Sequence, residues 1–527
     1  MSSPAGTRRK LHPALVFALI LLTLVGTHLP LLRLPYIWDE AGYYIPAARD
    51  LLLTGSVIPH STPSNAHPPL VMAYLALCWK VAGYAPMVTR CAVLVMAAFS
   101  LLGLFRLAET VANFEVATAS TLCTAFYSVF FTQSSLAHVD LAAAGLTFWA
   151  LHAYAEDRRG ATAFWLSLAV LAKETAILAP LALFLWERLR PVIGAKLGGW
   201  AGGFPAARIS KSALLLVPLV PLGLWYAYHY RQTGFVFGNP EFFRYNVQAT
   251  LQPLRAVLAL LIRLWQALGY LNLYLLSLAA LFAMWLPAVQ DEHGDRPRIA
   301  VDVQFGWLAV IVAYLLAMAV VGGAELARYM LPAVPLVIVI FVSTLWRRVR
   351  LWRGVIAIVI LGFVAGLLTN PRYGISLEDN LAYRDYIVLH QHAEEFTEAR
   401  YPMARVLTAW PASDELTRPY LGYLSRPMRV VRIDDFTIEQ LMSAADLRSS
   451  FEVALVFSTK YEPQHPLFEG WRTWQEWKTR YFGYHRDVPP AAAARILGGQ
   501  LVYSETRDGQ WVGVIEMEQV VDARLTR

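Results

Sequence analysis

Apolar segments long enough to cross a lipid bilayer recur through the first 370 residues of this chain. Runs such as Leu214 to Leu224 and Val310 to Val321 contain no charged residue. Only 16% of all residues are charged, against about 25% in soluble proteins. The alternating ten-residue segments of a membrane β-barrel do not occur. The sequence therefore excludes a soluble enzyme, a disordered chain and a fibrous repeat, and it predicts a polytopic α-helical membrane protein.

Eleven segments are predicted to span the membrane. They lie near residues 12–33, 88–107, 116–133, 141–155, 161–173, 175–187, 212–229, 270–289, 303–322, 331–346 and 353–369. Two further apolar stretches, 67–83 and 254–268, are interrupted by Lys80 and by Arg255 and Arg263. Their length leaves spans open, but we interpret both as amphipathic helices on the membrane surface.

The distribution of basic residues orients these spans. With eleven spans, one side receives Arg8 to Lys10, the basic loop at 188–211 and the cluster at 347–353. Because Lys and Arg accumulate in cytoplasmic loops, we expect a cytoplasmic N-terminus and an extracytoplasmic chain after residue 370. No small-residue cleavage site follows the first apolar segment, so we expect an uncleaved span and not a signal peptide.

The net charge and the cysteines exclude other classes. A formal charge of +7, from 45 basic and 38 acidic residues, is too small to indicate nucleic acid as a partner. Cys78, Cys91 and Cys123 all lie inside apolar stretches. The sequence therefore predicts neither a disulfide scaffold nor a metal cluster.

The character of the chain changes at residue 370. Residues 1–369 form the predicted membrane module, whose first outer loop is 34–87, and residues 370–527 form a predicted soluble α/β domain. Short apolar runs at 405–409, 428–433, 453–457 and 511–515 alternate there with helical patterns that begin at Asp414 and Thr437. This alternation is typical of a small α/β sheet.

An aromatic string in this domain has helical spacing: Trp471, Trp474, Trp477 and Tyr481. We expect this face to pack on the sheet or to rest on the membrane. A platform on which a sugar stacks is the alternative.

Charged residues near one membrane face form the candidate site, because charge at membrane level is costly and therefore often functional. They are Asp39, Glu40, Arg49, Asp50, His67, His138, Asp140, Lys173, Glu174, Glu325 and Arg328, accompanied by Tyr43, Tyr44 and Tyr329. Carboxylates can accept a proton or bind a cation, and basic groups can hold a phosphate. The set predicts a reaction between a phosphorylated lipid and an acceptor. Structural roles stay open for single members: Asp39 as a helix cap, and Lys173 with Glu174 as a neutral pair.

The order of these residues resembles the GT-C superfamily of polyprenyl-phosphate-dependent glycosyltransferases. The branch in question contains the protein O-mannosyltransferases and the aminoarabinose transferase that modifies lipid A. The resemblance covers about the first 370 residues and is carried by Asp39 to Tyr44, His67 to Leu70, Arg90, Asp140, Leu171 to Glu174 and Arg328 to Pro335.

This resemblance implies an inverting transfer at the outer face of a bacterial cytoplasmic (inner) membrane. The donor sugar would be carried on a polyprenyl phosphate, and the acceptor would be an envelope lipid, glycan or protein. The implied catalytic residues are Asp39, as base or acceptor-orienting carboxylate, with Glu40 and Asp140.

The implied donor phosphate-binding residues are His67, Arg90, Lys173, Arg328 and Tyr329. Aminoarabinose transferases carry Lys where this chain has His67, and mannosyltransferases carry His. We therefore expect the phosphate nearer Arg328, Tyr329 and Lys173. No metal-ligand set is predicted; a divalent cation is compatible with the carboxylates, but no cation requirement is expected.

A secondary transporter with membrane-embedded carboxylates is the alternative function. Transporters place their site near the bilayer midplane between repeated halves, whereas this chain has no internal repeat and its charges gather at one face. A non-enzymatic scaffold would explain the soluble domain but not the acidic and basic cluster.

Overall fold

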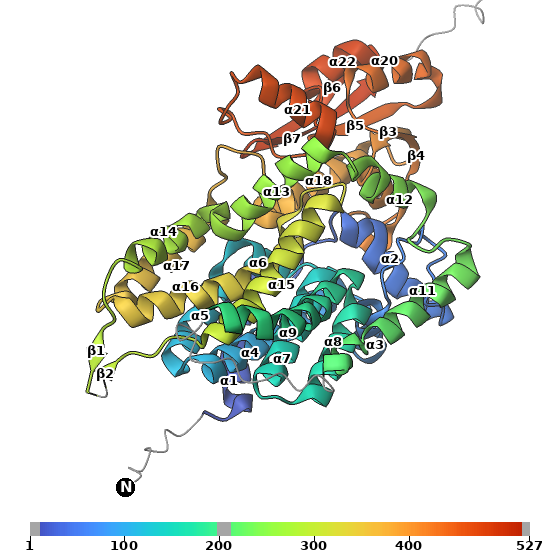
Figure 1. Ribbon diagram of the computed structural model, residues 1–527. Coiled ribbons are helices and arrows are strands. Elements are labelled where there is room, and N and C mark those ends of the chain that lie inside the picture. The colour runs from blue at the N-terminus through green and yellow to red at the C-terminus, as the bar shows by residue number, and fades with distance from the viewer. Residues whose placement is uncertain (1–10, 198–211, 293, 519–527) are drawn as a thin grey trace, which may run out of the picture.

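The computed structural model describes residues 11–197, 212–292 and 294–518. A large helical part carries an α/β domain at one end, and the helix that begins the described chain lies toward the opposite end (Figure 1). Arg8 to Lys10 and residues 198–211, which helped to orient the predicted spans, lie outside the described residues.

Helices occupy every predicted span. The helical part contains α1 (Pro13–His28), α2 (Ile45–Thr54), α3 (Leu70–Ala82), α4 (Pro86–Val111), α5 (Phe114–Phe126), α6 (Ser128–Gln133), α7 (Val139–Ala155), α8 (Arg159–Ala172), α9 (Leu178–Leu197), α11 (Leu219–Thr233), α12 (Pro240–Asn246), α13 (Pro253–Leu268), α14 (Leu273–Ala283), α15 (Val301–Val320), α16 (Val334–Arg348) and α17 (Trp352–Leu368). A two-stranded hairpin, β1 (Gln290–Asp291) and β2 (Gly294–Asp295), precedes α15. The helical fold class is thus confirmed.

Among the described residues, five helical stretches are both long and apolar enough to cross a membrane. They are Pro13–Leu31, Pro86–Val111, Ala213–Thr233, Pro253–Ala283 and Val301–Val320. Shorter apolar helices, such as Arg159–Ala172 and Trp352–Leu368, accompany them. The total of eleven spans therefore stays a prediction.

The stretch at 254–268 turns its charges inward. Arg255 and Arg263 on α13 are buried, and both form ion pairs with Glu325, at 3.2 and 2.7 Å. Leu261, on another face of the helix, is 58% exposed. The arginines that interrupt this segment thus bind α13 to the loop after α15, and apolar residues of the helix such as Leu261 stay exposed.

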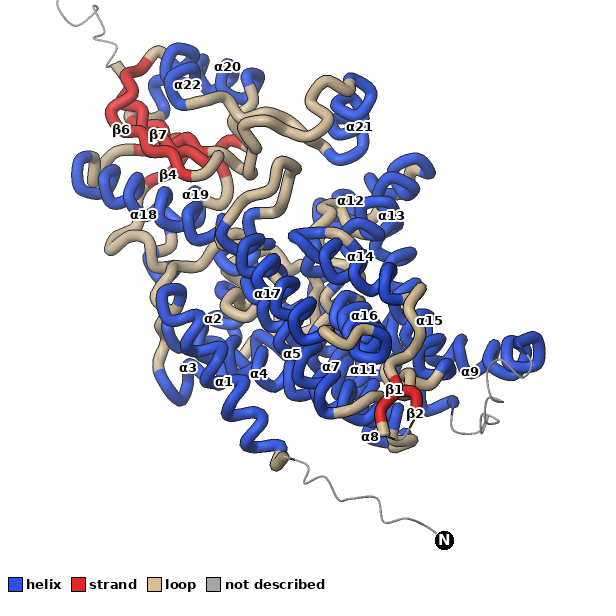
Figure 2. The backbone as a smooth tube through the Cα atoms, turned by 90° about the vertical axis from the view of Figure 1, so that its left-hand side faces the viewer, coloured by secondary structure: helices blue, strands red, loops and turns tan. Residues whose placement is uncertain are grey.

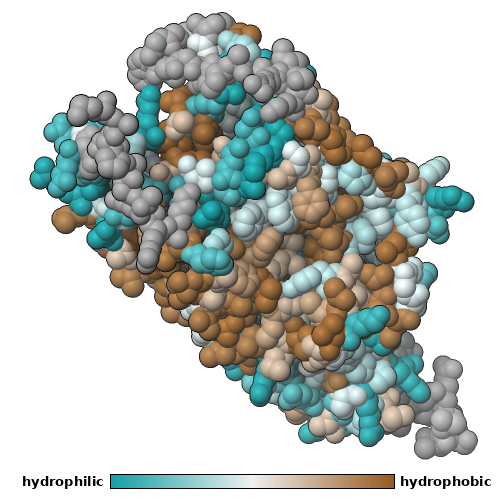
Figure 3. Space-filling model, turned by 90° about the horizontal axis from the view of Figure 1, so that it is seen from below, coloured by the Kyte–Doolittle hydropathy of each residue, from teal (hydrophilic) through white to brown (hydrophobic). Residues whose placement is uncertain are grey.

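Close helix packing in the core depends on small residues. A Cβ atom added at Gly145 of α7 would lie 1.9 Å from the Ser100 hydroxyl of α4. Such small residues allow membrane helices to approach closely. Seen from the end opposite the α/β domain, much of the outer surface is hydrophobic, with hydrophilic patches between (Figure 3).

The C-terminal region forms a five-stranded mixed sheet of order β4-β3-β5-β7-β6. Its strands are β3 (Arg405–Ala409), β4 (Arg429–Ile433), β5 (Val453–Phe457), β6 (Gly499–Arg507) and β7 (Gln510–Met517). Its helices are α18 (Ala382–Arg400), α19 (Ala412–Thr417), α20 (Ile438–Asp446), α21 (Arg472–Phe482) and α22 (Pro490–Leu497). β3 pairs in parallel with β4 and β5, while β7 is antiparallel to β5 and β6. Four strands were predicted and are confirmed.

The aromatic string forms helix α21, but its predicted packing on the sheet is wrong. No residue of α21 is buried, and Trp471 is 50% exposed. Helices α18 and α22 pack on the sheet instead. Phe482, the last residue of α21, places its ring 5.5 Å from the Arg255 guanidinium of α13. Figure 2 shows α21 facing α12 and α13. Contact with a membrane or a sugar stays a prediction.

Candidate active site

The candidate residues lie on short segments at the end of the helical part that faces the α/β domain. Asp39 precedes η2 (Glu40–Tyr44), a turn of π-helix, and Asp140 lies in the first turn of α7. Lys173 separates α8 from η3 (Glu174–Ile177). Arg328 and Tyr329 belong to η8 (Ala327–Met330). Trp38, beside Asp39, packs against Trp410 of the α/β domain at 4.9 Å between ring centroids.

Arg328 is the centre of the site. It is 1% exposed, and its guanidinium donates hydrogen bonds to Asp39 Oδ2 and Glu378 Oε2. Asp140 Oδ2 lies 3.4 Å from Arg328 Nε, and the His138 ring nitrogens lie 3.1 and 3.2 Å from Nη1. One guanidinium thus gathers carboxylates from three segments that are distant in the sequence.

Lys173 adds a second cation. Its Nζ lies 2.5 Å from Asp140 Oδ1 and 4.0 Å from the centre of the Tyr329 ring. Lys173 is 5% exposed. Asp140 therefore bridges the two cations. Lys173 pairs with Asp140 and not, as the structural alternative suggested, with its sequence neighbour Glu174, which pairs with His67.

His67 lies beside this cluster and pairs with an acidic side chain. Its Nδ1 is 2.8 Å from Glu174 Oε2. The Tyr44 ring lies between His67 and His138, at 5.8 and 5.7 Å between ring centroids. The structure thus brings Asp39, Asp140, His67, Lys173, Arg328 and Tyr329 into one region.

Strained backbone precedes two of these residues. Trp38, before Asp39, has φ of 47°, and Ala66, before His67, has φ of 59°. Residues other than glycine pay roughly 1–3 kcal/mol for this left-handed conformation, and they keep it only where the surroundings hold them. The Ala66 carbonyl accepts a hydrogen bond of 2.9 Å from Trp225 Nε1, which helps to hold it.

Asp39 does not cap a helix. Its side chain makes no hydrogen bond to the first turn of η2 and binds Arg328 instead. Its side chain is 28% exposed, whereas the Asp140 side chain is 3% and the Glu378 side chain 6% exposed. Among these three carboxylates, Asp39 is therefore the one that a solute can reach.

Glu40 and Arg90 form a separate buried pair. Arg90 Nη2 lies 3.0 Å from Glu40 Oε2, and the same guanidinium donates to the carbonyls of Ser135 and Pro35 at 2.6 and 2.7 Å. The amide of Ala137 donates to Glu40 Oε1 at 2.5 Å. These contacts fasten the first loop to the start of α7, and the predicted roles of Glu40 in catalysis and of Arg90 in phosphate binding stay predictions.

Glu378 is a further member of the cluster, and its place there was not predicted from the sequence. It lies in η9 (Leu377–Asp379), ten residues after α17 ends. Burial raises the pKa of this carboxyl to about 8, although the Arg328 guanidinium opposes the change. The sequence offered one signal for this residue: the acidic pair Glu378 and Asp379 follows closely after the last apolar segment. Glu378 therefore adds to the cluster a carboxyl group whose charge changes near pH 8.

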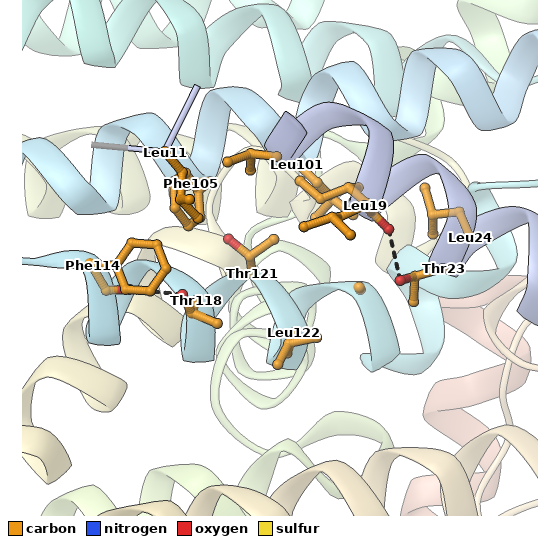
Figure 4. Close-up of a pocket in the computed structure, with 13 residues that line it drawn as sticks. Leu11, Leu19, Thr23, Leu24, Leu101, Phe105, Phe114, Thr118, Thr121 and Leu122 are labelled. Atoms are coloured by element: carbon orange, nitrogen blue, oxygen red, sulfur yellow. Dashed lines mark hydrogen bonds between the residues drawn. The ribbon is translucent and has the colours of Figure 1, made fainter. Parts of the chain in front are cut away.

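An apolar pocket of about 180 Å³ lies elsewhere, between α1, α4 and α5 (Figure 4). Leucine, phenylalanine and threonine side chains line most of it, including Leu19, Leu101, Phe105 and Thr121. It contains no ionisable side chain. Its chemistry fits a hydrocarbon chain and offers nothing to a reaction.

Comparison with known proteins gives one sequence match and several structural ones. The model of the dolichyl-phosphate-mannose-protein mannosyltransferase family matches residues 66–197, about a quarter of the chain. No curated protein matches.

Solved structures match over nearly the full length. ArnT from Cupriavidus metallidurans bound to undecaprenyl phosphate has a TM-score of 0.51 at 13% identity, over 95% of this chain and 97% of that chain. The apo state of ArnT gives a TM-score of 0.51 at 14% identity and the same coverage. AglB, an archaeal oligosaccharyltransferase from Archaeoglobus fulgidus in complex with an inhibitory peptide and a dolichol-phosphate, gives 0.47 at 10% identity, over 96% of this chain and 74% of that chain.

The similarity to ArnT confirms the predicted fold. Both chains are covered almost completely, so the helical part and the α/β domain both belong to the shared architecture. Together with the match of residues 66–197 to the mannosyltransferase family model, this similarity agrees with the predicted resemblance to GT-C glycosyltransferases and confirms it for the fold.

Proposed function

We propose that this chain transfers a sugar from a polyprenyl-phosphate donor to an acceptor at the outer face of a bacterial cytoplasmic membrane. The observation that carries the proposal is the buried Arg328, which gathers Asp39, Asp140 and Glu378 where the helical part meets the α/β domain. Guanidinium groups bind phosphate through paired, charge-assisted hydrogen bonds. The ArnT structure, which has this fold, holds undecaprenyl phosphate, and this supports the donor class.

Asp39 is the proposed general base. The acceptor hydroxyl attacks the anomeric carbon and gives its proton to the Asp39 carboxylate. The bond between the anomeric carbon and the phosphate oxygen breaks as the new bond forms, so the configuration inverts. The exposure of Asp39 within an otherwise buried cluster supports this role.

Arg328, Lys173 and Tyr329 are the proposed phosphate site. The leaving polyprenyl phosphate gains negative charge, which Arg328 and Lys173 stabilise in a buried setting where such interactions are strong. Asp140, between the two cations, orients both. His67, held by Glu174, borders this site on the Tyr44 side.

The transporter alternative finds no support in this arrangement. Transporters carry their charges near the middle of the spans. The cluster here sits at helix ends, against the α/β domain.

The direct test compares envelope glycolipids and glycoproteins by mass spectrometry in cells with and without the gene. The sugar that disappears identifies the group that is transferred, and the molecule that lacks it identifies the acceptor. An unchanged envelope, in cells shown to make the protein, would contradict the proposal.

The proposed membrane orientation predicts a labelling pattern. In intact cells, an impermeant thiol reagent should label Ser449→Cys and leave Gly198→Cys protected, because the α/β domain would be outside and residues 188–211 inside. Gly198 lies outside the described residues, and Ser449 lies after α20. Both variants are made in a chain without its three native cysteines. Labelling of Gly198→Cys with protection of Ser449→Cys would move the site to the cytoplasmic face.

The raised pKa of Glu378 predicts that donor binding weakens in base. Below about pH 8 the carboxyl is neutral and leaves Arg328 available to phosphate; above it the carboxylate competes for the same guanidinium. A polyprenyl phosphodiester keeps one charge over this range, so binding to purified protein should weaken between pH 7 and pH 9. Glu378→Gln should remove most of this change. If donor binding to Glu378→Gln depends on pH as steeply as in the wild type, the titrating group would be the neighbouring Asp39, Glu40, Asp379 or His138 instead.

A further inference from the structure

A second cluster of ionisable side chains lies inside the α/β domain, apart from the proposed active site. His390 and Glu394 lie one turn apart on α18, and Glu415 lies in the first turn of α19. All three are buried, at 1%, 0% and 0% exposed. His390 Nδ1 lies 2.6 Å from Glu415 Oε2 and 3.6 Å from Glu394 Oε1.

Several buried polar atoms of this cluster have no hydrogen-bond partner. Both carboxylate oxygens of Glu394, Oε1 of Glu415 and Nε2 of His390 are buried without a hydrogen bond. The hydroxyl groups of Tyr386 and Tyr423 are buried without one as well, and the charge of Glu415 acts on both tyrosines. Leaving buried polar groups unpaired destabilises a fold, so this concentration of unpaired groups indicates a missing ligand.

Within the described residues, no Lys or Arg compensates the two carboxylates. In residues 11–197, 212–292 and 294–518, neither Glu394 nor Glu415 forms an ion pair with Lys or Arg; His390 is their ion-pair partner. Buried charges in proteins are paired or coordinate a metal. A divalent cation would neutralise this pair.

We propose that His390, Glu394 and Glu415 bind a divalent transition metal ion, with Zn²⁺ as the best fit. One atom from each residue lies within 4.8 Å of the others. Zinc takes imidazole nitrogen and carboxylate oxygen at about 2.0–2.2 Å, so its ligands stand roughly 3.3 Å apart in a tetrahedron. The 3.6 Å separation matches this spacing, and the 2.6 Å hydrogen bond opens slightly as the metal enters. A water molecule completes the set.

The position of the site gives it a structural role. It joins α18, which packs on the sheet, to α19. Trp410, five residues before Glu415, lies against the first outer loop: a Cβ added at Gly42 would meet its ring at 2.9 Å. The ion would therefore hold Trp410 against the loop that carries Asp39. This inference does not depend on the proposed transferase activity.

The competing arrangement is a proton shared by the two carboxyl groups. Without a cation, burial and the adjacent Glu415 raise the pKa of Glu394 well above its usual range. A shared proton needs no metal, so the two arrangements differ in a measurable way.

The test measures metal content by mass spectrometry in the full-length chain, purified in detergent without chelator. We expect about one metal ion per chain, as for a single zinc site. Glu394→Gln and His390→Gln should lose it, and His392→Gln should keep it. His392 is the matched control because it lies on the same helix, is 47% exposed and binds Glu505.

Chelation provides a readout that does not require a variant to fold. Treatment of the wild-type protein with chelator should lower its melting temperature, Zn²⁺ should restore it, and Co²⁺ should give the visible absorption of a tetrahedral ion. Glu394→Gln should respond to none of these. Absence of metal in the purified protein, together with no response to Zn²⁺ or Co²⁺, would overturn the proposal in favour of the shared proton. Metal kept by both Glu394→Gln and His390→Gln would place the ion elsewhere.

Discussion

Replacing Asp39 by Asn is expected to reduce sugar transfer by roughly 10²- to 10⁴-fold, the range that loss of a general base produces. Asparagine keeps the size of the side chain and can still accept a hydrogen bond from Arg328, but it cannot take a proton. Donor affinity should be unchanged or slightly tighter, because the variant frees Arg328 from an ion pair. Turnover and donor binding are measured on the same purified protein.

The control for this variant is Asp434→Asn, an exposed carboxylate in the loop after β4. It should leave both turnover and binding unchanged. A helix-capping role would have predicted a silent Asp39→Asn substitution, since Asn caps as well as Asp, but the side chain makes no such hydrogen bond. Near-normal turnover would therefore transfer the role of base to Asp140 or Glu40.

Local sequence pattern predicted most of the elements of this fold. Continuous apolar runs marked the helices, and short β-branched runs such as 453–457 marked buried strands. β6 (Gly499–Arg507) was missed because its second half, Ser504 to Arg507, is polar and its burial is only partial. Nothing local distinguishes such an edge strand from a loop.

Hydrogen bonds and ion pairs between residues that are distant in the sequence could not be predicted from local pattern. Glu40 lies beside Asp39 in the sequence, yet its carboxylate turns to Arg90 and the amide of Ala137, while Asp39 turns to Arg328. The two adjacent carboxylates thus have different environments, formed by residues 50 and 289 positions away in the sequence. Glu378 joins the site for the same reason, through the return of the chain after α17.

Helix α21 shows the limit of periodicity. The aromatic spacing correctly predicted a helix at Arg472–Phe482. It could not say which surface the helix would meet, because the sheet was already covered by α18 and α22. Periodicity reports that a face is apolar, and the rest of the fold decides what covers it.

Replacing Arg328 is expected to have two large effects that must be separated. Arg328→Ala removes the shared partner of Asp39, Asp140 and Glu378, and breaking a buried ion pair costs about 3–5 kcal/mol. This variant should therefore melt at a clearly lower temperature. Any loss of donor binding in it could follow from lost structure alone.

Arg328→Lys and a double substitution resolve the ambiguity. Lysine keeps the charge but lacks the planar fork of donors, so Arg328→Lys should fold and still bind donor roughly 10- to 100-fold more weakly, as losing one charge-assisted hydrogen bond of about 1.5–3 kcal/mol implies. Adding Asp39→Asn to Arg328→Ala should recover part of the melting temperature, because one carboxylate no longer needs a cation, and should not recover donor binding. Arg384→Lys, at a partly exposed pair with Asp385, is the matched control. Normal donor affinity in folded Arg328→Lys would reduce Arg328 to a structural cation and leave Lys173 with Tyr329 to hold the phosphate.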